Sequence, residues 1–191
     1  TPRTVGGASA GGREAGSAGA AGPACVRRTP GRAMLGAMRI DVPEPSLVLL
    51  LGTAGSGKST LAARCFGETE VLSSDRLRAW IADDPSRQDV NDEAFEALDR
   101  LAEARLRHRR LTVVDATNLE RRAREPLRRI AKRAHLDAVV IALDVPVERC
   151  IARDRERPAR SVGPELIRAQ RALFERSLRS LREEGFRRVT R

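Results

Sequence analysis

One eight-residue segment constrains this chain more than any other: Gly52-Thr53-Ala54-Gly55-Ser56-Gly57-Lys58-Ser59. It fits the phosphate-binding P-loop pattern G-x-x-x-x-G-K-[ST] at every position. Residues 46–51 before it form an apolar run typical of a buried strand, and residues 60–66 after it are predicted to be a helix. In that arrangement backbone N–H groups and the helix N-terminus converge on phosphate oxygens. A glycine-rich turn without a ligand is the alternative, which the complete match and its context disfavour.

The motif assigns roles to its members. A P-loop lysine reaches the β- and γ-phosphates and the next hydroxyl binds Mg²⁺, which gives these roles to Lys58 and Ser59. We therefore expect ATP or another NTP, together with Mg²⁺, as the cofactors. The residues predicted to bind the nucleotide are Gly52, Thr53, Ala54, Gly55, Ser56, Gly57, Lys58, Ser59 and Thr60.

Strands and helices alternate from residue 39 onward. Strands are predicted at 46–51, 70–74, 111–114, 138–143 and 186–189, and helices at 60–66, 91–109, 120–135, 146–155 and 164–184. Pro126 is expected to kink or interrupt its helix. The alternation predicts an α/β fold of P-loop NTPase type, a parallel sheet with helices on both faces. Ligands bind such sheets beyond the carboxyl ends of the strands, where Gly52, Asp75 and Asp115 fall.

Asp75 follows the second predicted strand, in Ser73-Ser74-Asp75-Arg76-Leu77-Arg78. A carboxylate near the γ-phosphate can take the proton of an attacking hydroxyl, which makes Asp75 a candidate general base. Arg78 lies one turn farther on, where it could hold an anionic acceptor. The alternative is that Asp75 or Ser74 only caps a helix beginning at Arg76.

Asp115 ends an apolar strand in Val113-Val114-Asp115-Ala116-Thr117-Asn118. A carboxylate there can hold a Mg²⁺-bound water in the manner of a Walker B aspartate. It could instead anchor an arginine by a bidentate pair, or stabilise a turn at the end of the strand together with Asn118. Thr117 and Asn118 are weaker candidates for the site.

Three arginines near the end of one predicted helix, Arg153, Arg157 and Arg160, suit a mobile lid over triphosphate. Arg153 and Arg157 are four residues apart and share a helix face. Arginines in that position neutralise charge in phosphoryl transfer. The alternative is a solvated basic helix, since Asp154 and Glu156 dilute the charge.

Composition narrows the setting. The 191 residues suffice for one domain with a core, and a net charge of +10 favours a polyanionic partner or a charged, solvated surface. No run approaches the ~18 apolar residues of a membrane span, so no membrane partner is expected. Cys25, Cys65 and Cys150 are odd in number and widely spaced, which favours a reducing cytoplasm. His108 and His135 are expected at the surface.

Residues 1–38 differ from the rest, being rich in Gly, Ala, Ser and Arg with no hydrophobic period. Such a segment cannot bury enough apolar surface to offset its ordering entropy, so it is predicted to be disordered. Met38 is a plausible true start. A basic nucleic-acid-binding tail is the functional alternative. The P-loop kinase domain is expected over residues 39–191.

Residues 39–190 resemble the kinase domain of bacterial polynucleotide kinase-phosphatase, within the polynucleotide-kinase-like P-loop phosphotransferases. The P-loop is common to many ATPases. The Ser73-Ser74-Asp75 turn with Arg78 and the segment Asp115-Ala116-Thr117-Asn118 narrow the resemblance to this kinase group. The spacing of the lid arginines and the ending Glu184-Gly185-Phe186 point to the bacterial enzyme.

The resemblance implies transfer of the γ-phosphate of an NTP to a 5′-hydroxyl end of RNA or DNA, as in nucleic-acid repair. Asp75 would be the general base, and Arg78 would hold the 3′-phosphate of the terminal nucleotide. Arg153 and Arg157 would be lid cations, and Asp115 could orient Arg78 or support the metal. The family's phosphatase and ligase-type domains are absent from the 191 residues, so a stand-alone kinase or a fragment of a larger enzyme is expected.

Two other functions stay open. A small-molecule hydroxyl kinase would use the same loop, base and lid, because the scaffold does not fix the acceptor. Acceptor choice is expected in residues 76–110, where Arg78 and Trp80 are the candidates. A non-catalytic NTP-binding module is the third possibility, and the presence of Asp75 beside an intact Lys58 argues against it.

Overall fold

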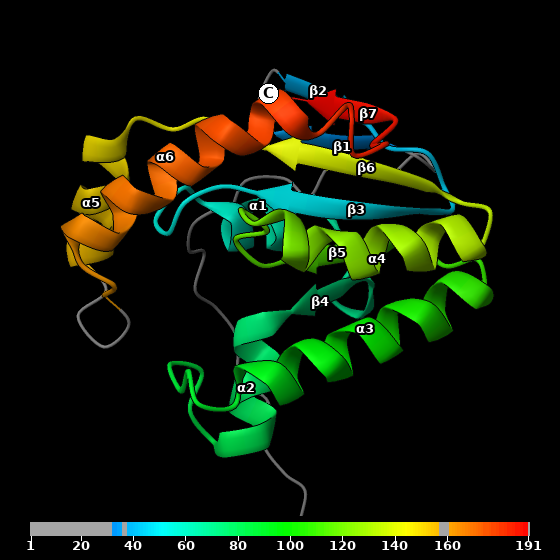
Figure 1. The fold of residues 1–191 in the computed structure, drawn as a ribbon, viewed down its shortest axis with the longest axis horizontal. Coiled ribbons are helices and arrows are strands. Elements are labelled where there is room, and N and C mark those ends of the chain that lie inside the picture. The colour runs from blue at the N-terminus through cyan, green and yellow to red at the C-terminus, as the bar shows by residue number, and fades with distance from the viewer. Residues whose placement is uncertain (1–31, 36–37, 157–160, 191) are drawn as a thin grey trace, which may run out of the picture.

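The computed structural model describes residues 32–35, 38–156 and 161–190. Its main feature is a five-stranded parallel sheet in the order β4-β5-β3-β6-β7 (Figure 1). The strands are β3 (Ser46–Leu51), β4 (Val71–Ser73), β5 (Thr112–Asp115), β6 (Asp137–Ala142) and β7 (Arg188–Thr190). The predicted α/β fold of P-loop NTPase type is confirmed.

Helices connect the strands in the predicted alternation. They are α1 (Lys58–Cys65), α2 (Ser74–Ala82), α3 (Asn91–Arg107), α4 (Arg121–Arg133), α5 (Val147–Arg155) and α6 (Pro164–Ser180), with a 3₁₀ turn, η1 (Glu68–Glu70), before β4. Strand ends differ from the prediction by one or two residues and helix ends by up to four. No helix among the described residues is both long and apolar enough to cross a membrane.

The central strand β3 is buried on both faces, which explains its unbroken apolar sequence. Because successive side chains of a strand point to opposite faces, its residues divide between two cores. Leu47, Leu49 and Leu51 pack in the core beneath α3, α4 and α6. Val48 and Leu50 pack on the other face against α1. Figure 1 shows α3 and α4 on one side of the sheet and α1 on the other.

Two predicted helices differ in detail from the observed ones. Helix α4 continues through Pro126, so the predicted interruption does not occur, and the alternative of a kink stays a prediction. Burial of Leu127, Ile130 and Ala131 on the inner face of the helix outweighs the lost backbone hydrogen bond. Helix α6 ends at Ser180, four residues earlier than predicted, and the chain then turns at Gly185 with φ +87°. His108 and His135 are exposed, as predicted.

The segment predicted to be disordered lies mostly outside the described residues, which omit 1–31 and 36–37. Within it, β1 (Arg32–Leu35) pairs antiparallel with β2 (Met38–Asp41). This hairpin departs from the prediction, because pairing between backbones requires no hydrophobic period. Cys25 also lies outside the described residues, whereas Cys65 and Cys150 are buried free thiols.

Candidate functional site

The P-loop joins the carboxyl end of β3 to the N-terminus of α1. Gly57 precedes the helix with φ +95°, a left-handed conformation that glycine adopts without a steric cost. The Lys58 side chain is buried and folds back over the loop. Its Nζ donates to the carbonyl oxygens of Gly52 at 2.9 Å and Thr53 at 2.7 Å. The loop therefore holds its own lysine in place and presents helix N–H groups to an anion.

Helix α5 contacts the P-loop at Cys150. Gly55 has φ +73°, and a Cβ at that position would lie 2.3 Å from the Cys150 carbonyl oxygen. Only glycine allows so close an approach of the two backbones. The Thr53 hydroxyl donates to Cys150 Sγ at 3.3 Å, and Arg153 donates to the Gly55 carbonyl at 3.4 Å. Cys150, which belongs to no sequence motif, thus contacts the P-loop through both its thiol and its backbone.

Helix α6 supplies a further contact, from Gln170. Its Oε1 accepts a hydrogen bond from the backbone N–H of Ala54 at 2.7 Å. Neither Gln170 nor Cys150 belongs to a sequence motif, so sequence reasoning missed both. Their positions depend on how α5 and α6 pack against the sheet.

The residues of the P-loop fit a nucleoside triphosphate. The loop offers backbone N–H groups, the Lys58 ammonium and a glycine cradle, and the Ser56 hydroxyl is buried with no hydrogen-bond partner in the described part of the chain. Ser59 and Thr60 are exposed in the first turn of α1. A kinase-like P-loop of this form binds a nucleotide.

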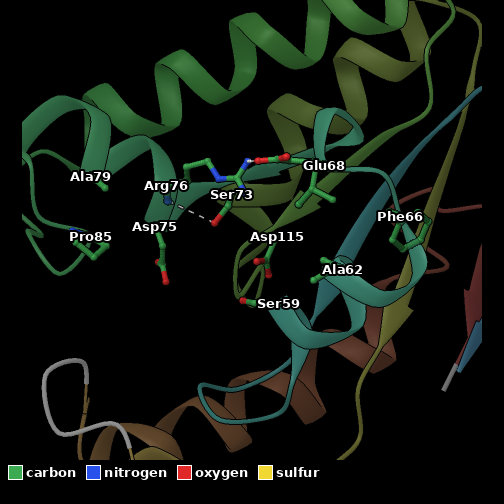
Figure 2. Close-up of a pocket in the computed structure, with 12 residues that line it drawn as sticks. Ser59, Ala62, Phe66, Glu68, Ser73, Asp75, Arg76, Ala79, Pro85 and Asp115 are labelled. Atoms are coloured by element: carbon green, nitrogen blue, oxygen red, sulfur yellow. Dashed lines mark hydrogen bonds and ion pairs between the residues drawn. The ribbon is translucent and has the colours of Figure 1, made fainter. Parts of the chain in front are cut away.

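A cavity of about 490 Å³ opens beside the loop (Figure 2). Helix α1 contributes Ser59, and the carboxyl end of β5 contributes Asp115. The first turns of α2 contribute Asp75, Arg76 and Ala79. Figure 2 shows the side chains of Ser59, Asp75 and Asp115 directed toward this space from three elements. The structure therefore brings together three of the predicted site residues.

The Asp115 carboxyl is buried, and burial raises its pKa above the ordinary aspartate value. A hydrogen bond from Ser59 and the positive charges of Lys58 and Arg76 oppose that rise. Asp115 does not orient Arg78, because the hydrogen bonds of that guanidinium within the described chain go to other residues. The contact with Ser59 places Asp115 beside the hydroxyl predicted to bind Mg²⁺, and a role of Asp115 at that metal stays a prediction.

Asp75 lies in the first turn of α2 and is not its cap. The cap is Ser73, whose Oγ accepts a hydrogen bond from the Arg76 N–H at 3.5 Å. The helix starts at Ser74, two residues before the predicted Arg76, so capping by Asp75 or Ser74 was the wrong alternative. The Asp75 side chain lines the cavity, as Figure 2 shows.

Arg78, the candidate for holding an anionic acceptor, is buried among protein groups. Its buried guanidinium donates to the Asp75 carboxylate, to the Pro85 carbonyl at 2.9 Å and to Asn91 Oδ1 at 3.0 Å. Burial lowers the pKa of Arg78. Arg78 does not line the cavity, whereas Arg76 does. Its geometry suits orienting Asp75, and the role on a 3′-phosphate stays a prediction.

The turn after Asp115 is tied to the P-loop. Gly52 N–H donates to the Thr117 carbonyl at 3.3 Å, and the Asn118 side chain donates to the Leu50 carbonyl at 2.8 Å. Asn118 has φ +50°, and its side-chain amide also donates to the Ala116 carbonyl at 3.2 Å, so Asn118 stabilises the turn as one alternative proposed. Thr117 and Asn118 thus hold the backbone at the end of β3 and the start of the P-loop.

Arg124 anchors that turn to the end of the chain. Its buried guanidinium donates to the carbonyls of Asn118 and Leu119 at 2.8 and 2.9 Å and forms an ion pair with Glu184 at 2.5 Å. Ser177 of α6 joins the same network. Sequence reasoning missed Arg124, because a buried arginine in so basic a helix has no distinguishing signal.

The predicted lid is described only in part. Arg153 contacts the loop, whereas Arg157 and Arg160 lie outside the described residues. Asp154, thought to dilute the basic charge, is instead buried and accepts hydrogen bonds from the Ser161 hydroxyl and the N–H groups of Val162 and Gly163. It has a structural role at the start of α6.

Comparisons with known proteins agree with this geometry. Residues 47–182 match a family model described as an AAA domain. A search of curated proteins finds no match.

Solved structures are similar over part of their length. One chain of the Pnkp1/Rnl/Hen1 complex is 25% identical, with a TM-score of 0.50, over 58% of this chain and 39% of that one. One chain of the Pnkp1/Rnl/Hen1 RNA repair complex is 22% identical, with a TM-score of 0.57, over 72% and 46%. The APS kinase CysC of Mycobacterium tuberculosis, with AMPPNP and APS, is 26% identical, with a TM-score of 0.46, over 59% and 69%. This chain thus spans less than half of each complex chain.

Proposed function

The chain belongs to the AAA domain family that its residues 47–182 match, and on that premise we propose that it transfers the γ-phosphoryl group of ATP to a 5′-hydroxyl end of RNA or DNA. The observation that carries the proposal is the convergence of Asp75, Ser59 and Asp115 on one cavity beside the P-loop. A nucleotide-binding module without catalysis has no need of a carboxylate at the position of Asp75.

In the proposed reaction the acceptor hydroxyl lies against Asp75 in the cavity. The hydroxyl oxygen forms a bond to the γ-phosphorus as the bond from that phosphorus to the bridging oxygen of ADP breaks. The hydroxyl proton passes to the Asp75 carboxylate, which acts as general base. Arg78 fixes the direction of this carboxylate from within α2.

The charge of the transferring group is met by residues around the loop. Lys58 and the N–H groups at the start of α1 would hold the β- and γ-phosphates, and Arg153 lies beside the loop at Gly55. Ser59 and Asp115 would hold Mg²⁺. The ion would supply charge neutralisation on the phosphate oxygens. Such stabilisation accounts for most of the catalysis in phosphoryl transfer.

Three observations favour a nucleic-acid acceptor. The net charge of +10 suits a polyanion. The motifs around Asp75 and Asp115 resemble those of polynucleotide kinases, and a chain of the Pnkp1/Rnl/Hen1 complex is 25% identical to this one. A small-molecule acceptor is the second candidate, because a cavity of about 490 Å³ is within the range of small-ligand sites.

The test is a labelling assay with purified protein, Mg²⁺ and γ-labelled ATP. Matched RNA and DNA oligonucleotides carry either a 5′-hydroxyl or a 5′-phosphate, and Lys58→Ala is the inactive control. Label on the 5′-hydroxyl oligonucleotides alone supports the proposal. A panel of small hydroxyl compounds is assayed in parallel, and label on these alone overturns the proposal in favour of the second candidate. ATP binding with no transfer to any acceptor overturns both.

A further inference from the structure

Trp80 is an exposed aromatic residue on α2, the helix that also lines the proposed acceptor cavity. It is the only tryptophan of the chain, which has no tyrosine, and 69% of its surface is exposed. It lies on α2, the helix that contributes Asp75, Arg76 and Ala79 to the cavity. Tryptophan is highly buried on average, so one this exposed presents a large aromatic face that a ligand can cover.

The helical geometry places Trp80 beside Arg76. The two residues are four apart, so they are neighbours on the helix surface, one turn from each other. At about 100° per residue, Trp80 lies only ~40° around the helix from Arg76, whereas Ile81 lies ~140° from it. Arg76 itself lines the cavity. Trp80 therefore neighbours one residue of the cavity wall, one turn farther along α2, whereas Ile81 lies on a different side of the helix.

Arg76 is the arginine of α2 that can reach a ligand. Its guanidinium forms an ion pair with Glu68 at 3.6 Å, between side chains that are 42% and 84% exposed. Figure 2 shows this pair at the edge of the cavity. An exposed ion pair of that length is weak and easily exchanged for another anion. The buried Arg78, in contrast, is held by three protein groups.

We propose that Trp80 and Arg76 form a subsite for the acceptor strand, in which the indole stacks on a nucleobase and the guanidinium binds an adjacent phosphate. A flat aromatic face next to a cation matches a base next to its phosphodiester. Stacking of this kind tolerates any base, so the subsite selects a polynucleotide over a small hydroxyl compound without selecting its sequence. The inference rests on the proposed function and names the residues that would give it its substrate class.

The first test uses the intrinsic fluorescence of the protein, which reports Trp80 alone because the chain has no other tryptophan and no tyrosine. A 5′-hydroxyl oligonucleotide is titrated without ATP, and a matched oligonucleotide with abasic sites serves as control. Quenching by the first and not by the second supports stacking. Equal quenching by both, or no change with either, overturns it.

The second test compares kinetics of Trp80→Ala with those of Ile81→Ala, a neighbouring residue that is 45% exposed. We expect Trp80→Ala to raise KM for the oligonucleotide by ~5- to 150-fold, the range for loss of one base–aromatic stack. Its kcat should change little, and Ile81→Ala should match wild type. Arg76→Gln should weaken the salt dependence of oligonucleotide binding.

Failure of this inference differs from failure of the proposed function. If wild type labels oligonucleotides while Trp80→Ala keeps the wild-type KM, the subsite is wrong and the kinase activity stands. If wild type labels no oligonucleotide at all, the proposed function itself is wrong.

Discussion

The guanidinium of Arg78 binds the carboxylate of Asp75 from one turn farther along α2. The same guanidinium is fixed by the Pro85 carbonyl and by Asn91 Oδ1 at the start of α3. The direction of Asp75 is thus set by the packing of two helices, while its other side faces the cavity. A general base needs this kind of support, because proton transfer depends on its position relative to the acceptor hydroxyl.

Asp75→Asn should therefore lower kcat by ~10²–10⁴-fold, the usual contribution of a general base. ATP affinity should change little, since Lys58 and the loop are untouched. The control is Asp83→Asn, an exposed aspartate at the end of the same helix, where φ +55° suits asparagine. Single-turnover transfer and ATP binding measured in parallel would check this. A near wild-type rate for Asp75→Asn would mean that another group takes the proton.

Two glycines with positive φ make a matched pair for the P-loop. Gly55→Ala places a Cβ 2.3 Å from the Cys150 carbonyl, whereas Gly163→Ala meets no atom within 4 Å. We expect Gly163→Ala to cost only the backbone strain, ~1–3 kcal/mol in the free energy of unfolding. Gly55→Ala should cost more and also abolish nucleotide binding. Denaturant unfolding and ATP titration would check both. Equal effects of the two variants would contradict the close contact between Gly55 and the Cys150 backbone.

The buried ion pair of Arg124 and Glu184 predicts a non-additive pair of substitutions. Glu184→Leu alone should lower the free energy of unfolding by ~3–5 kcal/mol, because it leaves a buried cation without its partner. Adding Arg124→Met should recover part of this loss. Urea unfolding of both single variants and the double variant gives the coupling energy. Additive losses would show that the two side chains act independently.

Asp99 is a half-buried carboxyl whose ionisation should destabilise the fold. Burial raises its pKa to about 6, within a groove between α3 and α4. The groove is lined by Glu96, Asp99, Arg100, Glu103, Pro126, Arg129, Ile130 and Arg133. The folded state thus holds this proton more tightly than the unfolded state, whose aspartate pKa is ~3.9, so the charged form destabilises the fold above pH 6.

Asp99→Asn should accordingly raise the free energy of unfolding at pH 8 by ~1–2 kcal/mol, a figure reduced for partial solvent screening. The gain should fade as the pH falls from 6 toward 4, where wild type is protonated as well. Unfolding of both proteins at several pH values would check it, with Asp83→Asn for comparison. A gain that does not vary with pH would have another cause.

Much of this architecture was predictable because local chemistry dictates it. The run at 46–51 is apolar on both faces because β3 is the central strand, and the P-loop motif fixes the geometry of Gly57 and Lys58. Side-chain partners were not predictable. Nothing in the sequence distinguishes the buried Arg124 from the exposed Arg122, or shows that Arg78 faces Asp75 while Arg76 lines the cavity. Those outcomes depend on helix rotation and packing.

The network around Arg124 also determines how short a working fragment of this protein can be. A chain cut after Arg182 would keep every strand that flanks the P-loop yet lack Glu184. The carbonyls of Asn118 and Leu119 would then be bound by an Arg124 guanidinium that had lost its counter-ion. Any expression boundary, fusion point or tag should therefore be placed beyond β7, which follows the core residue Phe186 and pairs with β6.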